Sequence, residues 1–354
     1  MLNLRIKKIL KRVNRSRYHR RHRLVASRVL RSIEKDRGPL SPSIKNEARD
    51  YAQEVLGWNG YAPWLYVYSA VAGRFKEGWI PDDYYGAVVV PRVKGQYGRV
   101  SSLNCLGEKL FDGAVFPDLL HAVNGAFIRP FDGRVLRPDR LRTYLFNERD
   151  RVVFKADSSN QGKGLVFFDE QGFSEHMLCQ AGNGVIQAVV PQHSFFRQFV
   201  ERSTATLRIT TVMNDDGGVS ARAAYLRFGQ GRDTHVMSAS HIRVAVDLDS
   251  GELADVGYTP DWRLLEAHPD SGAHFKGCGL PGYERAVDMV TRAHSSYPYV
   301  RAIGWDVVID ESSEPKVIEW NGFHNDIKFS EATQGPCFAG LGWNALGKTA
   351  RDYA

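Results

Sequence analysis

Alternating apolar and polar positions predict strands through the middle of the chain. The runs "RVVFKA" (151–156), "GVIQAVV" (184–190) and "STATLRITTVM" (203–213) are rich in β-branched residues and favour a period of two. Glycine, proline or polar segments separate these runs and predict the loops between them. The pattern therefore predicts a succession of strands in this part of the chain.

The preceding region, from residue 38 to about 145, predicts a small α/β region. "SIKNEARDYAQEVLGW" predicts a helix with Ser43 as its N-cap. The valine run of "YGAVVVPRVKG" (85–95) predicts a strand. In "FPDLLHAVNGAFI" (116–128) we expect a short helix followed by a strand.

Two short apolar runs joined by a polar turn predict a hairpin in "GWDVVIDESSEPKVIEWNG" (304–322). Reflecting the chain about a turn centred between residues 312 and 313 places Asp306 opposite Glu319, and Asn321 takes the next position on that face. Opposed carboxylates repel unless a cation lies between them. Three hard oxygen ligands suit Mg²⁺. An exposed hairpin with a hydrated polar face is the alternative.

The polar loop "SSNQGKG" (158–164) connects two of the predicted strands. It lacks the Walker pattern and leads into a strand, but Gly162 and Gly164 would let backbone N–H groups approach a phosphate. Lys163 lies in the loop, and Lys155 lies inside an apolar strand, where an ammonium is costly without an anion. Together they favour nucleotide phosphates, whereas either lysine alone is more typical of the surface.

Arg208 lies at mid-strand between Leu207 and Ile209. A phosphate, a carboxylate substrate group or an aspartate within the fold would each explain an arginine in that position, and the sequence leaves these alternatives open. The strand at 184–190 ends at Pro191, and its irregular end could offer backbone groups to a purine edge.

The composition is that of a soluble globular protein with two or three domains: 354 residues, 43% hydrophobic and 25% charged. No apolar stretch approaches the length of a membrane span, and no signal-peptide pattern follows the start. The four cysteines are scattered singly, as in a reduced cytosolic protein. We therefore expect a cytoplasmic location.

Positive charge is concentrated in residues 1–37, which hold 14 Lys and Arg against Glu34 and Asp36. This segment carries a net +12 against +7 for the whole chain, so the remainder carries −5. We expect a basic amphipathic helical arm that lies on an anionic membrane surface. Nucleic acid is disfavoured as a partner because the arm has one aromatic residue, Tyr18. Packing of the helix on the protein body is the other alternative.

In this order, "FKADSSNQGKG", "VIQAVV", "TLRITTV" and "GWDVVID…KVIEWNG" resemble the ATP-grasp superfamily. Within it the chain is most similar to the sugar-transfer-associated ATP-grasp proteins of bacterial surface-polysaccharide clusters. The resemblance implies an α/β (α+β) ATP-grasp fold in which two α/β subdomains, residues 141–230 and 231–354, clasp ATP. An N-terminal α/β region (38–140) and the basic arm (1–37) would precede them.

The resemblance also implies roles for individual residues. Lys155 would contact the α- and β-phosphates, and the glycine loop would close over the triphosphate. Arg208 and Lys163 would stabilise charge on the transferred group. Two Mg²⁺ ions, replaceable by Mn²⁺, would bind the hairpin. The implied set comprises Ser159, Gly162, Lys163 and Gly164 in the loop, Gln187, Ala188, Val189 and Val190 at the adenine, and Asp306, Glu319 and Asn321 at the metals.

The implied activity is an ATP-dependent ligase that joins a carboxylate to an amine through an acyl-phosphate, releasing ADP and phosphate. Its substrates would be small or glycan-linked, in surface-polysaccharide or related biosynthesis, and the basic arm would hold it at the inner face of the cell membrane. A kinase acting on a sugar or polyol hydroxyl is the first alternative. A metal-dependent nuclease is another, although it leaves Lys155 and the glycine loop unexplained, and a pseudo-enzyme that binds ATP structurally stays open.

Overall fold

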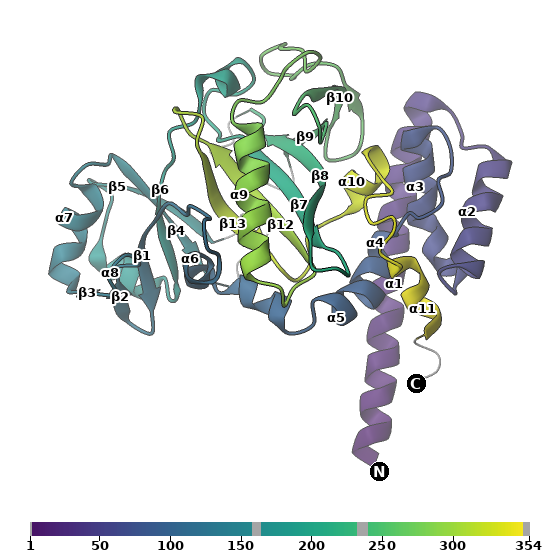
Figure 1. Cartoon of the computed structure of the whole chain (residues 1–354), viewed down its shortest axis with the longest axis horizontal. Coiled ribbons are helices and arrows are strands. Elements are labelled where there is room, and N and C mark those ends of the chain that lie inside the picture. Colours follow the sequence, from purple (N-terminus) through teal and green to yellow (C-terminus); the bar gives the residue numbers. More distant parts are fainter. Residues whose placement is uncertain (1, 158–163, 232–239, 350–354) are drawn as a thin grey trace. The chain divides into compact units, whose positions relative to one another are not determined.

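The computed structural model describes residues 2–157, 164–231 and 240–349, with side chains from residue 13 to 348 inside these ranges. The chain divides into two compact units, and Figure 1 labels most of their helices and strands. We call them the helical unit (residues 1–95, 261–264 and 324–354) and the sheet unit (residues 96–260 and 265–323).

Helices form the helical unit. Helix α1 (Leu2–Arg37) packs against α3 (Ala62–Ala72), and its Ala26, Val29 and Ile33 are buried. The basic segment expected as an arm thus lies in α1. The other elements are α2 (Pro42–Glu54), α4 (Asp82–Tyr84), a π-helix (Tyr85–Val89), α5 (Val90–Val93), α10 (Lys328–Thr333), α11 (Leu346–Thr349) and the 3₁₀ helices Asn59–Tyr61 and Trp343–Ala345.

The N-cap of α2 is Ser41, not the expected Ser43. The Ser41 hydroxyl accepts a hydrogen bond from the Ile44 backbone N–H, and Pro42 occupies the first turn. Proline suits that position because its fixed φ is helical and its missing N–H has no partner there. The predicted helix was correct, and its start was set by the proline.

The strand expected at residues 85–95 is wrong. Residues Tyr85–Val93 form the π-helix and α5, in which the three consecutive valines are buried. Pro91 lies in the first turn of α5, whereas in a central strand it would remove a ladder hydrogen bond. Burial of the whole valine run removed the distinction between helix and strand on which the prediction depended.

The sheet unit contains a first sheet in the order β3-β2-β1-β6-β4-β5. Its core is lined by Leu120, Leu145, Phe154 and Ile186. The strands are β1 (Asp118–Val123), β2 (Ala126–Ile128), β3 (Val135–Leu136), β4 (Arg151–Ala156), β5 (Leu165–Asp169) and β6 (Gly184–Ala188), with helices α6 (Gly107–Leu110), α7 (Leu141–Phe146) and α8 (Glu175–Gln180) and 3₁₀ helices Tyr97–Ser102, Asn104–Leu106, Pro138–Arg140 and Ser194–Gln198.

The helix expected after residue 116 is also wrong, because β1 and β2 form a hairpin. Asn124 and Gly125 have φ values of 52° and 81° and form its two-residue turn. Positive φ at both positions matches the twist of the flanking strands and is the reason that Asn-Gly favours hairpins. The dipeptide was the signal for this hairpin.

The second sheet has the order β11-β10-β9-β8-β7-β12-β13 (Figure 1). Helix α9 (Tyr283–Ser296) covers it, and its Ala286, Met289 and Val290 join Ile209 and Trp305 in one core. The strands are β7 (Thr206–Met213), β8 (Val219–Phe228), β9 (Ile242–Val246), β10 (Leu253–Tyr258), β11 (Leu264–Leu265), β12 (Ala302–Ile309) and β13 (Pro315–Asn321).

The two sheets confirm the expected mixed α/β class, with antiparallel pairing wherever strand register is described. All four cysteines are free thiols. In the described part of the chain, no helix has both the length and the apolar character that crossing a bilayer requires.

Candidate functional site

The β12-β13 hairpin confirms the predicted pairing of Asp306 with Glu319. The pairing is not a simple reflection, because Val307 pairs with Val317 rather than with Ile318. The turn is therefore centred one half-residue earlier than expected, and Ile318 is an extra residue that forms a β-bulge. The bulge restores the predicted register at the two carboxylates.

At the bulge, the Ile318 carbonyl accepts hydrogen bonds from outside the hairpin. It accepts a hydrogen bond from Lys155 Nζ at 2.9 Å and a longer one from Gln187 Nε2 at 3.4 Å. Lys155 is on β4 and Gln187 on β6, so these bonds join the first sheet to the hairpin of the second. Gln187 Nε2 also lies 2.8 Å from Asp118 Oδ1. The structure thus brings the predicted lysine and the predicted metal hairpin into contact.

Lys155 is half-buried, with its ammonium against the Ile318 carbonyl. Desolvation lowers the pKa of its ammonium, and the nearby Glu319 and Asp118 carboxylates oppose that shift. A partly desolvated ammonium is costly unless an anion approaches it. A bound phosphate group would supply such an anion.

Asp306 is held by two arginines. Arg208 lies directly opposite on β7, with its Nε 2.5 Å from Asp306 Oδ1 and its Nη2 3.0 Å from Oδ2. Arg227 Nη2, from β8, lies 2.6 Å from Oδ1. Burial alone would raise the pKa of Asp306, but the arginine charges and hydrogen bonds outweigh it and hold the pKa well below the usual range. Of the alternatives for Arg208, the ion pair with aspartate is the contact seen.

Glu319 is placed differently from Asp306. Its side chain retains solvent access, and no hydrogen-bond donor reaches its carboxylate from the described residues. Surrounding protein and the nearby Asp306 raise its pKa, and Lys155 opposes this. Asn321 Nδ2 points toward the Gly304 carbonyl at 3.4 Å, which leaves the amide oxygen for another partner.

These donors fit a hard divalent cation. Glu319 offers a carboxylate with no protein donor, and Asn321 offers an amide oxygen, which are ligand types that Mg²⁺ prefers. Asp306 differs, because both of its oxygens are engaged by arginines and it could join a metal only by sharing them. Gln187 Oε1 is a buried acceptor without a partner in the described structure, available to a ligand donor.

The remaining predicted residues divide into two groups. At the predicted hinge, the Ala188 backbone N–H donates to the Pro117 carbonyl at 2.8 Å, and Val189 and Val190 follow the end of β6 as half-buried residues. In the loop, Gly164 has φ 86°, and its carbonyl accepts from the Ala156 N–H. Ser159, Gly162 and Lys163 lie outside the described residues.

Sequence reasoning missed Arg227 and Asp118. Arg227 had the same signal as Arg208, an arginine within an apolar strand, here in "AAYLRF". Asp118 and His121 would face opposite sides of a regular strand, but a bulge in β1 near Leu119 lets His121 Nε2 lie 3.3 Å from Asp118 Oδ2. With Glu108, they form a group of possible metal ligands within 4.8 Å of one another.

The sequence of residues 175–340 matches the family model for sugar-transfer associated ATP-grasp proteins. This segment belongs to that family. The ATP-grasp segment spans α8 to α10 and contains Arg208, Asp306, Glu319 and Asn321, whereas Lys155 and its loop precede it. The recognition of the superfamily from the sequence is confirmed.

Solved structures that match the chain include three enzymes. Biotin carboxylase from Campylobacter jejuni is 12% identical, with 93% of this chain and 69% of that chain covered and a TM-score of 0.45. D-cycloserine synthetase is 14% identical, with 73% of each chain covered and a TM-score of 0.39. N5-carboxyaminoimidazole synthetase from Staphylococcus aureus is 10% identical, with 70% and 52% covered and a TM-score of 0.40. A search of curated proteins gave no match.

Proposed function

We propose that this protein is an ATP-dependent ligase that joins a carboxylate to an amine. The main support is the contact of Lys155 with the Ile318 carbonyl of the Glu319 hairpin, which lies inside the ATP-grasp segment. This contact places a desolvated cation beside a carboxylate that has no donor from the described protein. A bound phosphate group would pair with the lysine, and the metal bound to that phosphate would take the carboxylate as a ligand.

The proposed reaction has two steps. A substrate carboxylate oxygen attacks the γ-phosphorus of ATP, the bond between that phosphorus and the bridging β–γ oxygen breaks, and ADP leaves. The amine nitrogen then attacks the acyl carbon, the carbon–phosphate oxygen bond breaks, and inorganic phosphate leaves as the nitrogen loses a proton. Neither step needs a redox partner.

The side chains have complementary roles in this proposal. Lys155 would bind the α- and β-phosphates once an anion replaces its bond to Ile318. Arg208, fixed by Asp306 on the neighbouring strand, would present a guanidinium to the transferred group without a large loss of side-chain entropy. Lys163, Ser159, Gly162 and Gly164 would cover the triphosphate, and Gln187 to Val190 would border the adenine.

Glu319 and Asn321, with Asp306 where the arginines share it, would hold two Mg²⁺ ions. When bound, the ions would neutralise phosphate charge and so favour phosphoryl transfer. We propose that the two ATP-grasp subdomains are residues 141–230 and 231–323, and that the second ends before the expected residue 354 because residues 324–354 belong to the helical unit. We also propose a role in surface-polysaccharide biosynthesis, for which the sugar-transfer association of the family is the support. A cytoplasmic location with peripheral membrane contact through the basic residues 1–37 is part of the same proposal.

The decisive experiment follows the oxygen atoms. The protein is incubated with Mg-ATP and a panel of amino acids and uronic acids whose carboxylates carry oxygen-18. An acyl-phosphate mechanism transfers one labelled oxygen to the released phosphate and gives a new amide mass. A phosphorylated hydroxyl product without free phosphate would instead indicate the kinase alternative. If no substrate gave either product and ATP did not bind, both the ligase and the kinase activity would be refuted.

A charge-removing variant tests the site. Glu319→Gln removes the carboxylate charge, and Glu314→Gln is the matched control because Glu314 is an exposed residue of the same hairpin turn. Turnover should fall by at least about 100-fold in the first variant, since metal stabilisation of phosphoryl transfer is worth several kcal/mol. Stability should change little, because Glu319 accepts no hydrogen bond from the described protein. Equal turnover in the two variants would remove Glu319 from the site.

A further inference from the structure

The helical unit contains a cavity of about 850 Å³ with a strongly basic lining. Arg15, Arg20 and Arg23 line it from α1, and Arg49 lines it from α2. Trp58 and Tyr66 also line it. We call this the arginine cavity. Its volume lies within the range of roughly 300–1,000 Å³ that small-molecule sites occupy.

The positive charge of the arginine cavity is not balanced. No aspartate or glutamate lines it, and Arg15, Arg20 and Arg23 have no carboxylate within ion-pair distance in the described structure. Among the described residues, Arg49 forms a hydrogen bond with the exposed Asn46 at 2.9 Å and lies 3.9 Å from the exposed Asp50. Like charges on one helix face are destabilising, so this clustering calls for an anion.

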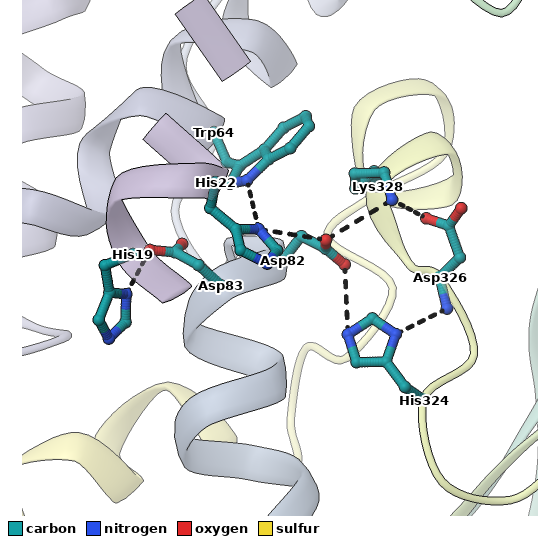
Figure 2. A network of polar contacts seen from close by, with 8 residues as sticks. All are labelled: His19, His22, Trp64, Asp82, Asp83, His324, Asp326 and Lys328. Atoms are coloured by element: carbon teal, nitrogen blue, oxygen red, sulfur yellow. Dashed lines mark hydrogen bonds and ion pairs between the residues drawn. The ribbon is translucent and has the colours of Figure 1, made fainter. Parts of the chain in front are cut away.

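A buried network fixes the arginine face of α1 (Figure 2). His19 also lines the cavity and is buried, with its Nδ1 2.9 Å from Asp83 Oδ2, while its Nε2 has no partner in the described structure. One turn after His19 along α1, His22 Nδ1 accepts a hydrogen bond from Trp64 Nε1 at 3.2 Å. His22 also lies beside Asp82, which contacts His324 and Lys328.

The network has a consequence for binding. Because histidines 19 and 22 are tied to α4, helix α1 cannot rotate its arginines out of the cavity without breaking buried contacts. A pre-organised set of donors loses less entropy when a ligand binds. The arginine cavity is thus built before its ligand arrives.

An aromatic wall borders the arginines. Trp58 is 41% exposed, and its indole lies 5.0 Å from the Tyr61 ring and 4.9 Å from the His19 ring between centroids. Gly60 permits this position, because a Cβ there would lie 2.2 Å from the indole Cζ2 atom. Burial raises the pKa of the Tyr61 hydroxyl, and the nearby Arg15 opposes that shift. An exposed aromatic surface beside cations suits a ligand with both an anionic and an organic part.

We propose that the arginine cavity binds a phosphate or diphosphate ester of a compact organic group. Guanidinium forks match phosphate oxygens in pairs, and four of them suit a group with two or more negative charges. The Trp58 side would pack on the organic part. This site lies in the helical unit, whereas Lys155 and Glu319 lie in the sheet unit, so it does not depend on the proposed ligase activity.

The test measures binding to the full-length protein in EDTA, which suppresses metal-dependent ATP binding. The probes are pyrophosphate, phenyl phosphate and glucose 1-phosphate by calorimetry, with glucose as the neutral control. Arg20→Gln/Arg23→Gln is the main variant, and Arg28→Gln/Arg31→Gln is its control, because those exposed arginines lie on the same helix outside the cavity. We expect about 100-fold weaker binding in the first variant, from two lost charge-assisted contacts, and less than about twofold in the control.

Two further variants separate the parts of the site. Arg49→Gln removes a cation from α2 and should weaken all phosphate probes by about tenfold, independently of α1. Gly60→Ala should displace Trp58, weakening phenyl phosphate more than pyrophosphate. Circular dichroism melts check that each variant is folded.

Vesicles distinguish a lipid headgroup from a soluble ester. Binding to phosphatidylglycerol but not phosphatidylcholine vesicles, with no soluble probe bound, would assign the phosphate to a lipid, and the dependence on Arg20 and Arg23 should be the same. Unchanged binding in Arg20→Gln/Arg23→Gln, an equal loss in the control variant, or no binding of any probe would overturn the proposal. Binding of only single-stranded oligonucleotides would also overturn it and would indicate a nucleic-acid surface.

Discussion

A chain of buried hydrogen bonds in the sheet unit permits a sharp stability prediction. Trp305 Nε1 donates to Thr211 Oγ1 at 2.8 Å, and His294 Nε2 lies 2.7 Å from the Val300 carbonyl. Because that carbonyl only accepts, His294 Nε2 carries the proton, and its Nδ1 accepts from the Thr211 hydroxyl at 2.7 Å. The threonine is thus the link between β12, β7 and α9.

Thr211→Val keeps the shape of the side chain but breaks both of its bonds. The Trp305 N–H and the His294 Nδ1 then each lose the hydrogen bond to the threonine hydroxyl, in side chains that are 0% exposed. Loss of a hydrogen-bond partner by a buried group costs about 1–3 kcal/mol. The desolvation cost of the threonine hydroxyl is absent in the variant, which offsets part of this loss. We expect a net loss of about 2–4 kcal/mol in the free energy of unfolding of this sheet.

Thr211→Ser is the matched control, because it keeps the hydroxyl and removes one methyl group. It should cost about 1 kcal/mol. Hydrogen exchange of peptides from β7 and β12, read by mass spectrometry over a urea series, reports this sheet separately from the helical unit. If the valine variant were as stable as the serine variant, the assigned direction of the hydrogen-bond chain would be wrong.

Three other substitutions have defined outcomes. Lys155→Met should weaken ATP binding by at least about tenfold, measured by calorimetry. The melting temperature should not fall, because a desolvated ammonium is lost. A large loss of stability in a thermal melt would contradict this reasoning. Arg227→Gln should lower the free energy of unfolding of the sheet unit by about 1–3 kcal/mol in urea. The loss should be smaller than that from breaking the whole ion pair, because Arg208 still neutralises Asp306. No change would show that Arg227 is dispensable. Burial raises the pKa of Glu331 to about 7, so its contribution is fully present below the unfolded pKa near 4.5 and is lost as pH rises through 7. Between pH 4.5 and 8, stability of the helical unit should therefore fall by roughly 3 kcal/mol relative to Glu331→Gln, and parallel pH profiles of the two proteins would refute this.

The hairpin pairing could be predicted because it depends on local order along the chain. Reflection about a turn determines which residues face each other, and the turn lay within half a residue of its expected centre. The bulge at Ile318 had no signal in the sequence, yet without it Asp306 would pair with residue 318 and Glu319 would face the other side of the sheet. The prediction was right at Glu319 because two small departures cancelled.

Contacts between distant segments could not be predicted in this way. Residues 324–354 complete the helical unit formed by residues 1–95, and Glu331 accepts hydrogen bonds from the Ile80 and Cys337 N–H groups inside it. The partner of Arg208 was likewise open, because strand order decides it: Asp306 is opposite only because β12 follows β7 in the sheet. Periodicity identifies strands but does not order them.

The arginines change the electrostatics expected of the carboxylate pair. Asp306 and Glu319 face each other as predicted, yet three cationic side chains, Lys155, Arg208 and Arg227, surround them. The three positive charges are matched by the carboxylates of Asp306 and Glu319 and by that of Asp118, which acts on Lys155, so the ligand-free site is close to neutral. Such a site offers a bare divalent cation little net attraction. We infer that a metal would enter together with the triphosphate rather than before it, because the triphosphate brings the negative charge that attracts the cation.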